Sequence, residues 1–181
     1  VNIQGFGDGV TSGSGADIFS YPVAPGTNVT LQNPVLVNLA KGDYILSDAW
    51  GQPGAVYDTW NFQSTAPGSW GSHYVVAEPA NGSTYNILLD VTTNLEPSCK
   101  NHFCAWDTQA QAAQAFLDTP SALLHLSKDT LVAFAAADYY LPDNLGGISL
   151  SITPVPLPAG VWLFGSGLLG FWKIRRGKNS D

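Results

Sequence analysis

Short runs of β-branched and aromatic residues alternate with turn residues along most of the chain. The turns that separate these runs are Lys41-Gly42, Gln52-Pro53-Gly54, Ala66-Pro67-Gly68, Ala80-Asn81-Gly82 and Leu145-Gly146. Runs of about four to eight such residues, bounded by Gly, Pro or Asn, are typical of β-strands. We therefore predict strands at residues 35–39, 43–47, 56–62, 74–78, 85–91, 123–127, 131–137 and 147–153. This many short strands predict an all-β fold, a jelly-roll-like antiparallel β-sandwich.

One short helix is predicted to interrupt the strands. Its apolar residues recur at helical spacing at Ala110, Ala113, Phe116 and Leu117. Asp107 is placed to cap its first turn, and Pro120 would stop it. We expect this helix to pack across one end of the sandwich.

The composition divides the chain into three segments. Residues 1–28 are rich in Gly, Ser, Asn and Pro, which predicts an irregular N-terminal arm or, as the alternative, an extended edge segment. Residues 29–154 carry the predicted strands and are long enough to bury one apolar core, which predicts a single β-sandwich domain. Residues 155–181 hold a proline motif, an apolar run and a basic end.

The apolar run spans residues 160–172 and contains no charged residue. A basic cluster follows directly and consists of Lys173, Arg175, Arg176 and Lys178. From Pro158 to Ile174, the 17 residues would span roughly 25 Å as a helix, the short end for a hydrocarbon core of ~30 Å. We predict a single transmembrane helix here. Because basic clusters stay on the cytoplasmic side, the domain is expected outside a bacterial inner membrane, in the periplasm or at the cell surface.

Small residues keep the predicted transmembrane helix thin, namely Gly160, Gly165, Ser166, Gly167 and Gly170. Ser166 and Gly170 have the spacing at which two helices approach closely in lipid. This pattern favours packing against integral-membrane partner subunits. The alternative is that glycines are simply frequent in membrane spans.

The chain outside the basic end is strongly acidic. Residues 1–172 carry three Lys, no Arg and thirteen Asp or Glu, a net charge of −10. Such a surface repels phosphates and argues against nucleic-acid binding, whereas it fits Ca²⁺ binding or solubility at high ionic strength. No nucleophile elbow, zinc-protease motif, phosphate-binding loop or dinucleotide fingerprint occurs, so an enzyme is not predicted.

The chain has two cysteines, Cys99 and Cys104. In an exported protein such a pair predicts a local disulfide. The alternative is a metal site that would recruit His102 and either His73 or His125. The disulfide is favoured because no second cysteine pair exists.

Asp138, Asp143 and Asn144 place three oxygen-bearing side chains within seven residues of a predicted loop. Such side chains can hold one Ca²⁺, with backbone carbonyls and water completing its ~6–8 ligands. Gly146 and Gly147 would permit the tight return of the backbone. The alternative is an ordinary turn, in which Asp and Asn hydrogen-bond to their own backbone.

Aromatic residues gather between positions 44 and 74, at Tyr44, Trp50, Tyr57, Trp60, Trp70 and Tyr74. Aromatic faces on loops can stack on the C–H faces of sugars. We therefore take Trp50, Trp60 and Trp70 as candidates for a carbohydrate- or partner-binding surface. The alternative is that these aromatic residues belong to the core of alternating strands, which we favour for the three tyrosines.

The segment Val155-Pro156-Leu157-Pro158-Ala159, with the apolar run and the basic end, resembles the VPLPA-type variant of the PEP-CTERM sorting signal. In that family a bacterial exosortase recognises the proline motif and processes the protein near it, which sends the domain to the cell surface or matrix. The resemblance implies that Pro156, Pro158 and Ala159 form a sorting motif.

The run from Asp138 to Ile152 resembles the final loop and strand of galactose-binding-type jelly rolls. In such folds, acidic and amide side chains of this loop hold calcium. Upstream, Gly42-Asp43-Tyr44, residues 57–62, Ser69-Trp70 and Tyr74 are similar to a recurrent ectodomain of exosortase targets. That domain also carries an Asp-Asn-x-Gly-Gly ending just before its anchor.

Two functional hypotheses follow from the sequence. In the first, the chain is a non-catalytic exported domain, anchored in the inner membrane, that acts as an accessory or structural subunit or as an envelope-matrix protein. In the second, it is an exosortase-processed surface protein that binds carbohydrate, such as an extracellular polysaccharide, with the help of calcium.

Overall fold

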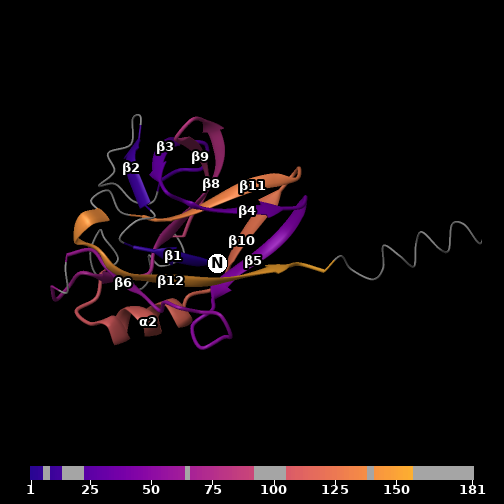
Figure 1. The fold of residues 1–181 in the computed structure, drawn as a ribbon. Coiled ribbons are helices and arrows are strands. Elements are labelled where there is room, and N and C mark those ends of the chain that lie inside the picture. The colour runs from indigo at the N-terminus through magenta and orange to yellow at the C-terminus, as the bar shows by residue number, and fades with distance from the viewer. Residues whose placement is uncertain (6–8, 14–22, 64–65, 92–104, 138–140, 157–181) are drawn as a thin grey trace, which may run out of the picture.

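The computed structural model describes residues 1–5, 9–13, 23–63, 66–91, 105–137 and 141–156 (Figure 1). Within these ranges the chain forms two six-stranded, mainly antiparallel sheets and one α-helix. The prediction of an all-β fold with one short helix is therefore confirmed. No helix in these ranges is long and apolar enough to cross a bilayer. The predicted transmembrane helix, Cys99 and Cys104 lie outside the described residues.

The first sheet is built around β12, a ten-residue strand. Its strands in spatial order are β10 (Ala122–Leu126), β5 (Gly42–Asp48), β12 (Leu145–Pro154), β6 (Trp60–Asn61) and β7 (Trp70–Gly71), and β1 (Asn2–Gln4) also pairs with β12. The second half of β12 pairs with β5, and its first half pairs with β6 and β1. One strand therefore joins segments that are far apart in the sequence.

The second sheet curls until two of its strands meet. Its order is β2 (Gly9–Gly13), β3 (Asn28–Gln32), β9 (Thr84–Asp90), β8 (Tyr74–Asn81), β11 (Thr130–Ala136) and β4 (Val35–Leu39). β2 also pairs in parallel with β11, at Gly9 and Ala136, so five of the strands form a closed ring. A separate cluster of buried side chains belongs to this ring, with alanines from β8 and β11 packed against larger residues from β3 and β9. Closing the ring covers strand edges that would otherwise be open to other chains.

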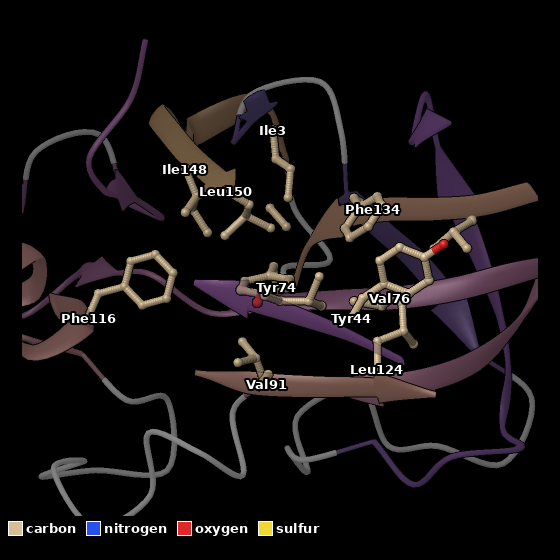
Figure 2. Close-up of a cluster of buried hydrophobic side chains, with 14 of the residues drawn as sticks. Ile3, Tyr44, Tyr74, Val76, Val91, Phe116, Leu124, Phe134, Ile148 and Leu150 are labelled. Atoms are coloured by element: carbon tan, nitrogen blue, oxygen red, sulfur yellow. The ribbon is translucent and has the colours of Figure 1, made fainter. Parts of the chain in front are cut away.

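The main core lies between the two sheets (Figure 2). Its side chains come from both sheets and from the helix, and they include Ile3, Leu46, Tyr74, Val76, Phe116, Leu124, Phe134, Ile148 and Leu150. β10 alternates between buried and exposed residues, as a strand with one solvent face should, whereas β8 and β11 have consecutive buried residues. Because each large apolar side chain stabilises the fold by ~1.5–3 kcal/mol on burial, this core holds the two sheets together.

Helix α2 (Gln109–Leu117) is capped by Thr108, so the predicted cap at Asp107 is wrong. The Thr108 hydroxyl accepts a hydrogen bond from the Gln111 N–H at 3.3 Å, and the Gln111 side chain accepts one from the Thr108 N–H at 3.2 Å. These two bonds form a capping box. The helix packs Phe116 into the main core, where its ring meets that of Tyr74 at a centroid distance of 6.3 Å.

The N-terminal segment contains strands, so the prediction of an irregular arm over residues 1–28 is wrong for β1 and β2. Ile3 in β1 is fully buried, and the amino group of Val1 donates a hydrogen bond to the Leu150 carbonyl at 2.8 Å. Val1 and Ile3 alternate with polar residues, but a run of four residues is too short to predict a strand by its period. Pairing with β12, rather than local preference, makes this segment a strand.

The strand predicted at residues 56–62 is reduced to the two residues of β6. The N–H groups of Val56 and Tyr57 both donate to the hydroxyl of Ser149, each at 2.9 Å. The Ser149 hydroxyl accepts these hydrogen bonds instead of the backbone carbonyls of a neighbouring strand. Side-chain hydrogen bonds of this kind compete with regular secondary structure. The other predicted strands lie within three residues of observed ones at each end.

Candidate functional site

A polar groove opens where β5 ends beside β12, two strands that Figure 1 shows as neighbours. Its volume is about 460 Å³, and it is lined by Ser47, Asp48, Ala49, Gln52, Pro53, Leu150 and Ser151. The strand register brings this lining together, because Ser47 is paired with Ser151 and Asp48 with Leu150. The groove therefore depends on contacts between residues about a hundred positions apart.

The loop that follows β5 forms the rest of the groove. The Gln52 N–H donates to the Ala49 carbonyl at 2.9 Å, and the Ala55 N–H donates to the Gln52 carbonyl at 3.1 Å. Gly51 and Gly54 have φ angles of 81° and 86°, which glycine adopts at little cost. These tight turns hold Gln52 beside the ends of the two strands.

Asp48 gives the groove its charge. Its Oδ1 accepts a hydrogen bond from the Trp50 N–H at 2.8 Å. Partial burial raises the pKa of Asp48, the N–H groups of Trp50 and Ala49 oppose this rise, and the negative charge of Asp58 adds to it. Burial and the charge of Asp48 also raise the pKa of Tyr74. The residues that line the groove thus include Asp48, Gln52 and two serines, Ser47 and Ser151.

Trp50 is the candidate aromatic residue in the loop that bounds this groove. It stands between Ala49 and Gln52, which line the groove, and it is 47% exposed. Trp60 is 0% exposed and belongs to the main core, so its predicted place on a binding surface is wrong. Trp70 is partly buried and exchanges two backbone hydrogen bonds with Trp106, at 2.9 and 3.2 Å. Of the three candidate tryptophans, Trp50 is therefore the exposed one, and it belongs to the loop that bounds the groove.

Two of the three predicted calcium ligands lie at a corner where the chain enters β12. Asp143 ends the short 3₁₀ helix η2 (Leu141–Asp143), and Asn144 follows it. Asn144 is 0% exposed, and its Nδ2 donates to the Gly5 carbonyl at 2.9 Å. Its Oδ1 is also buried and has no hydrogen-bond partner among the described residues. Asp138 lies outside the described residues.

The two glycines after Asn144 allow close backbone contacts at this corner. Gly146 has a φ of 82°, and a Cβ at this position would lie 2.6 Å from the Thr59 carbonyl oxygen. A Cβ on Gly147 would overlap the Ile3 carbonyl oxygen and lie 2.8 Å from the Tyr57 ring. Both positions must therefore be glycine, because only glycine lets β1 and the segment before β6 lie this close to β12.

Calcium binding at the corner stays a prediction. In the described part of the chain, no three His, Cys, Asp or Glu side chains group to hold a metal ion. If calcium binds, the melting temperature should rise with calcium relative to chelator, by the equivalent of ~2.7 kcal/mol at a hundredfold excess over Kd. Asp143→Ala should abolish this rise and Asp107→Ala should keep it, as differential scanning fluorimetry can show. An equal rise in wild type and Asp143→Ala would contradict the site.

The two described histidines lie in different places: His73 lies between β7 and β8, and His125 lies in β10. His73 is buried, its ring centroid lies 4.8 Å from that of Trp60, and burial lowers the pKa of His73 to about 4. His125 is exposed and contacts Asp43 on the neighbouring strand at 2.6 Å. His102, which the alternative metal site would need, lies outside the described residues.

The described chain ends at the opposite end of β5 from the groove. The Val155 N–H donates to the Asp43 carbonyl at 2.8 Å, and Pro156 is exposed. The other predicted tail residues lie outside the described ranges, namely Pro158, Ala159, Gly160, Gly165, Ser166, Gly167, Gly170, Lys173, Arg175, Arg176 and Lys178.

Sequence reasoning missed the polar residues of the groove, above all Asp48, Gln52 and Ser151. The available signal was the loop after β5, in which Trp50 stands beside two glycine turns. Ser151 gave no signal, because only its pairing with β5 brings it to the site.

No protein family, no curated protein and no solved structure matches this chain. The geometry of the groove and the chemistry of its lining are therefore the observations that bear on function.

Proposed function

We propose that this chain is a non-catalytic, carbohydrate-binding β-sandwich protein, displayed outside a bacterial inner membrane by its C-terminal segment. The observation that carries the proposal is the polar groove, together with the exposed Trp50 in the loop that bounds it. Its sequence support is the apolar, basic-ended tail and the resemblance to exosortase targets.

The groove has the chemistry that sugar recognition requires. The exposed face of an indole can pack against the C–H face of a sugar ring. The carboxylate of Asp48, the amide of Gln52 and the hydroxyls of Ser47 and Ser151 can exchange hydrogen bonds with sugar hydroxyls. Its volume falls within the ~300–1,000 Å³ that is usual for small-ligand sites.

The position of the groove suits a protein that is tethered by its tail. The chain leaves β12 beside Asp43, whereas the groove lies beside Asp48, five residues further along β5. At ~3.3 Å per residue these positions are roughly 17 Å apart along the strand. If the tail is held in a membrane, the groove is displaced from that surface and can meet a polymer in the envelope or matrix.

Substitution of Trp50 tests the proposal. We expect the full chain in neutral detergent to bind at least one of four immobilised hexasaccharides, of glucose, galactose, N-acetylglucosamine or glucosamine. Trp50→Ala should weaken this binding about tenfold, because loss of aromatic stacking and its buried area costs ~1–2 kcal/mol. Leu123→Ala is the matched control, since Leu123 is 63% exposed on β10 and does not line the groove.

Equal binding by Trp50→Ala and Leu123→Ala would overturn the proposed site. No binding of wild-type protein to any of the four would overturn the carbohydrate function. In that case, recovery of integral-membrane proteins with the chain in mild detergent would favour the accessory-subunit function. The small residues of the tail, such as Ser166 and Gly170, favour that second candidate.

A further inference from the structure

The described lysines lie far from the groove, whereas the amino group of Val1 donates a hydrogen bond to the carbonyl of the lining residue Leu150 at 2.8 Å. Lys41 precedes β5, and its N–H donates to Asp129 at 2.8 Å. Lys128 lies in the turn after β10 and forms an ion pair with Glu78 at 3.5 Å. Both are at the end of the sheet where β5 begins, roughly 20 Å from Asp48 at ~3.3 Å per residue. Since charges on a surface are screened within ~8 Å at physiological ionic strength, neither lysine offsets the charge in the groove.

The carboxylates near the groove have neutral partners. Asp48 accepts the Trp50 N–H, and Asp58 accepts the Thr59 N–H at 2.7 Å and the Gln109 side-chain amide at 2.9 and 3.0 Å. Neither carboxylate forms an ion pair within the described residues. Burial is the main cause that raises the pKa of Asp48, and the charge of Asp58 adds to it. A cationic group in the groove would relieve this repulsion.

We propose that the groove selects glycans with free amino groups, such as polymers of de-N-acetylated amino sugars, and that Asp48 binds the sugar ammonium. This inference rests on the proposed carbohydrate function and names its substrate class. A charge-assisted hydrogen bond is roughly twice as strong as a neutral one. The acetylated form of the same sugar offers only a neutral amide to Asp48.

The same arrangement disfavours acidic polysaccharides. A uronic acid or sulfated sugar would bring a second negative charge to Asp48 without a described lysine or arginine in the groove lining to receive it. The net charge of −10 over residues 1–172 repels such polymers before they reach the groove. Selectivity among sugars therefore follows from charge as well as from shape.

The test compares three hexamers that differ in charge, those of glucosamine, N-acetylglucosamine and galacturonate. Binding to the full chain in neutral detergent is measured by calorimetry at about 0.15 M salt. We expect the glucosamine hexamer to bind about tenfold more tightly than its acetylated form, and the galacturonate hexamer to bind most weakly. In Asp48→Asn, the dissociation constants of the glucosamine hexamer and the N-acetylglucosamine hexamer should become nearly equal, so that their ratio falls to near one.

A second variant distinguishes the effect of the Asp48 charge in the groove from the effect of the overall negative charge of the domain. Asp118 is exposed at the C-terminal end of α2 and does not line the groove, so Asp118→Asn should keep the tenfold ratio. A ratio near one in the wild type, a ratio unchanged in Asp48→Asn, or an equal loss in both variants would each overturn the inference. If the wild type binds the neutral hexamers through Trp50 with no preference for amines, the proposed function stands and only the substrate class fails. If it binds no hexamer, both fail.

Discussion

Replacing Gly146 or Gly147 by alanine should lower the free energy of unfolding by about 3 kcal/mol or more. At Gly146 the new Cβ would meet the Thr59 carbonyl at 2.6 Å, and the backbone has a positive φ as well. At Gly147 it would meet the Ile3 carbonyl and the Tyr57 ring. Since the carbonyl oxygens of Thr59 and Ile3 are backbone atoms, a rotamer change cannot relieve the contacts with them. Urea unfolding followed by tryptophan fluorescence measures the loss.

Gly54→Ala provides the matched control for the backbone angle. Gly54 has a φ of 86°, close to that of Gly146, but a Cβ at Gly54 would meet nothing within 4 Å. Gly54→Ala should therefore cost only the ~1–2 kcal/mol of the left-handed conformation. If Gly146→Ala is no more destabilising than Gly54→Ala, the close contact between β12 and the segment before β6 is not as described.

Lowering the pH from 7.5 to 5 should reduce the free energy of unfolding by about 2 kcal/mol through His73 alone. Its pKa is about 4 in the fold, because burial disfavours the charged ring, against 6.5 in an unfolded chain. Between these values the unfolded chain binds the proton and the folded chain does not. Stability contributed by the neutral ring is thus complete above pH 6.5 and declines as the pH falls toward 4.

Two measurements isolate this effect from that of the carboxylates. His73→Phe keeps a ring beside Trp60 and removes the titration, so its stability should fall less than that of the wild type between pH 7.5 and 5. In the wild type, magnetic resonance of the His73 ring should show no protonation down to about pH 5. Titration of that ring near pH 6.5 would contradict its burial, whatever the stability of the variant.

Local patterns predicted the strands that have regular alternation and clear turns. β4 begins and ends where its apolar run does, between Pro34 and Ala40. β1 escaped prediction because three residues carry no period, and its place depends on pairing with β12. The predicted strand at 56–62 failed because Ser149, distant in sequence, takes two of its N–H groups.

The site was predicted only where one residue is informative by itself. Trp50 follows a strand and stands in a glycine turn, so exposure could be expected. The sequence could not predict that Asp48 and Ser151 line the same groove, because this depends on the register of β5 against β12. Asn144 belongs to a motif that suggests a cation site, yet its side-chain amide donates a buried hydrogen bond to the Gly5 carbonyl.

The most direct test of the central claim is to locate a bound glycan on the molecule. The backbone amide resonances of the full chain in neutral detergent are recorded during titration with whichever of the tested hexamers binds most tightly. Binding in the groove predicts shifts at residues 47–52 and 150–151 and at the Trp50 indole N–H. Shifts centred instead on residues 38–40 and 129–131, which line a smaller cavity at the other end of the domain, would contradict it.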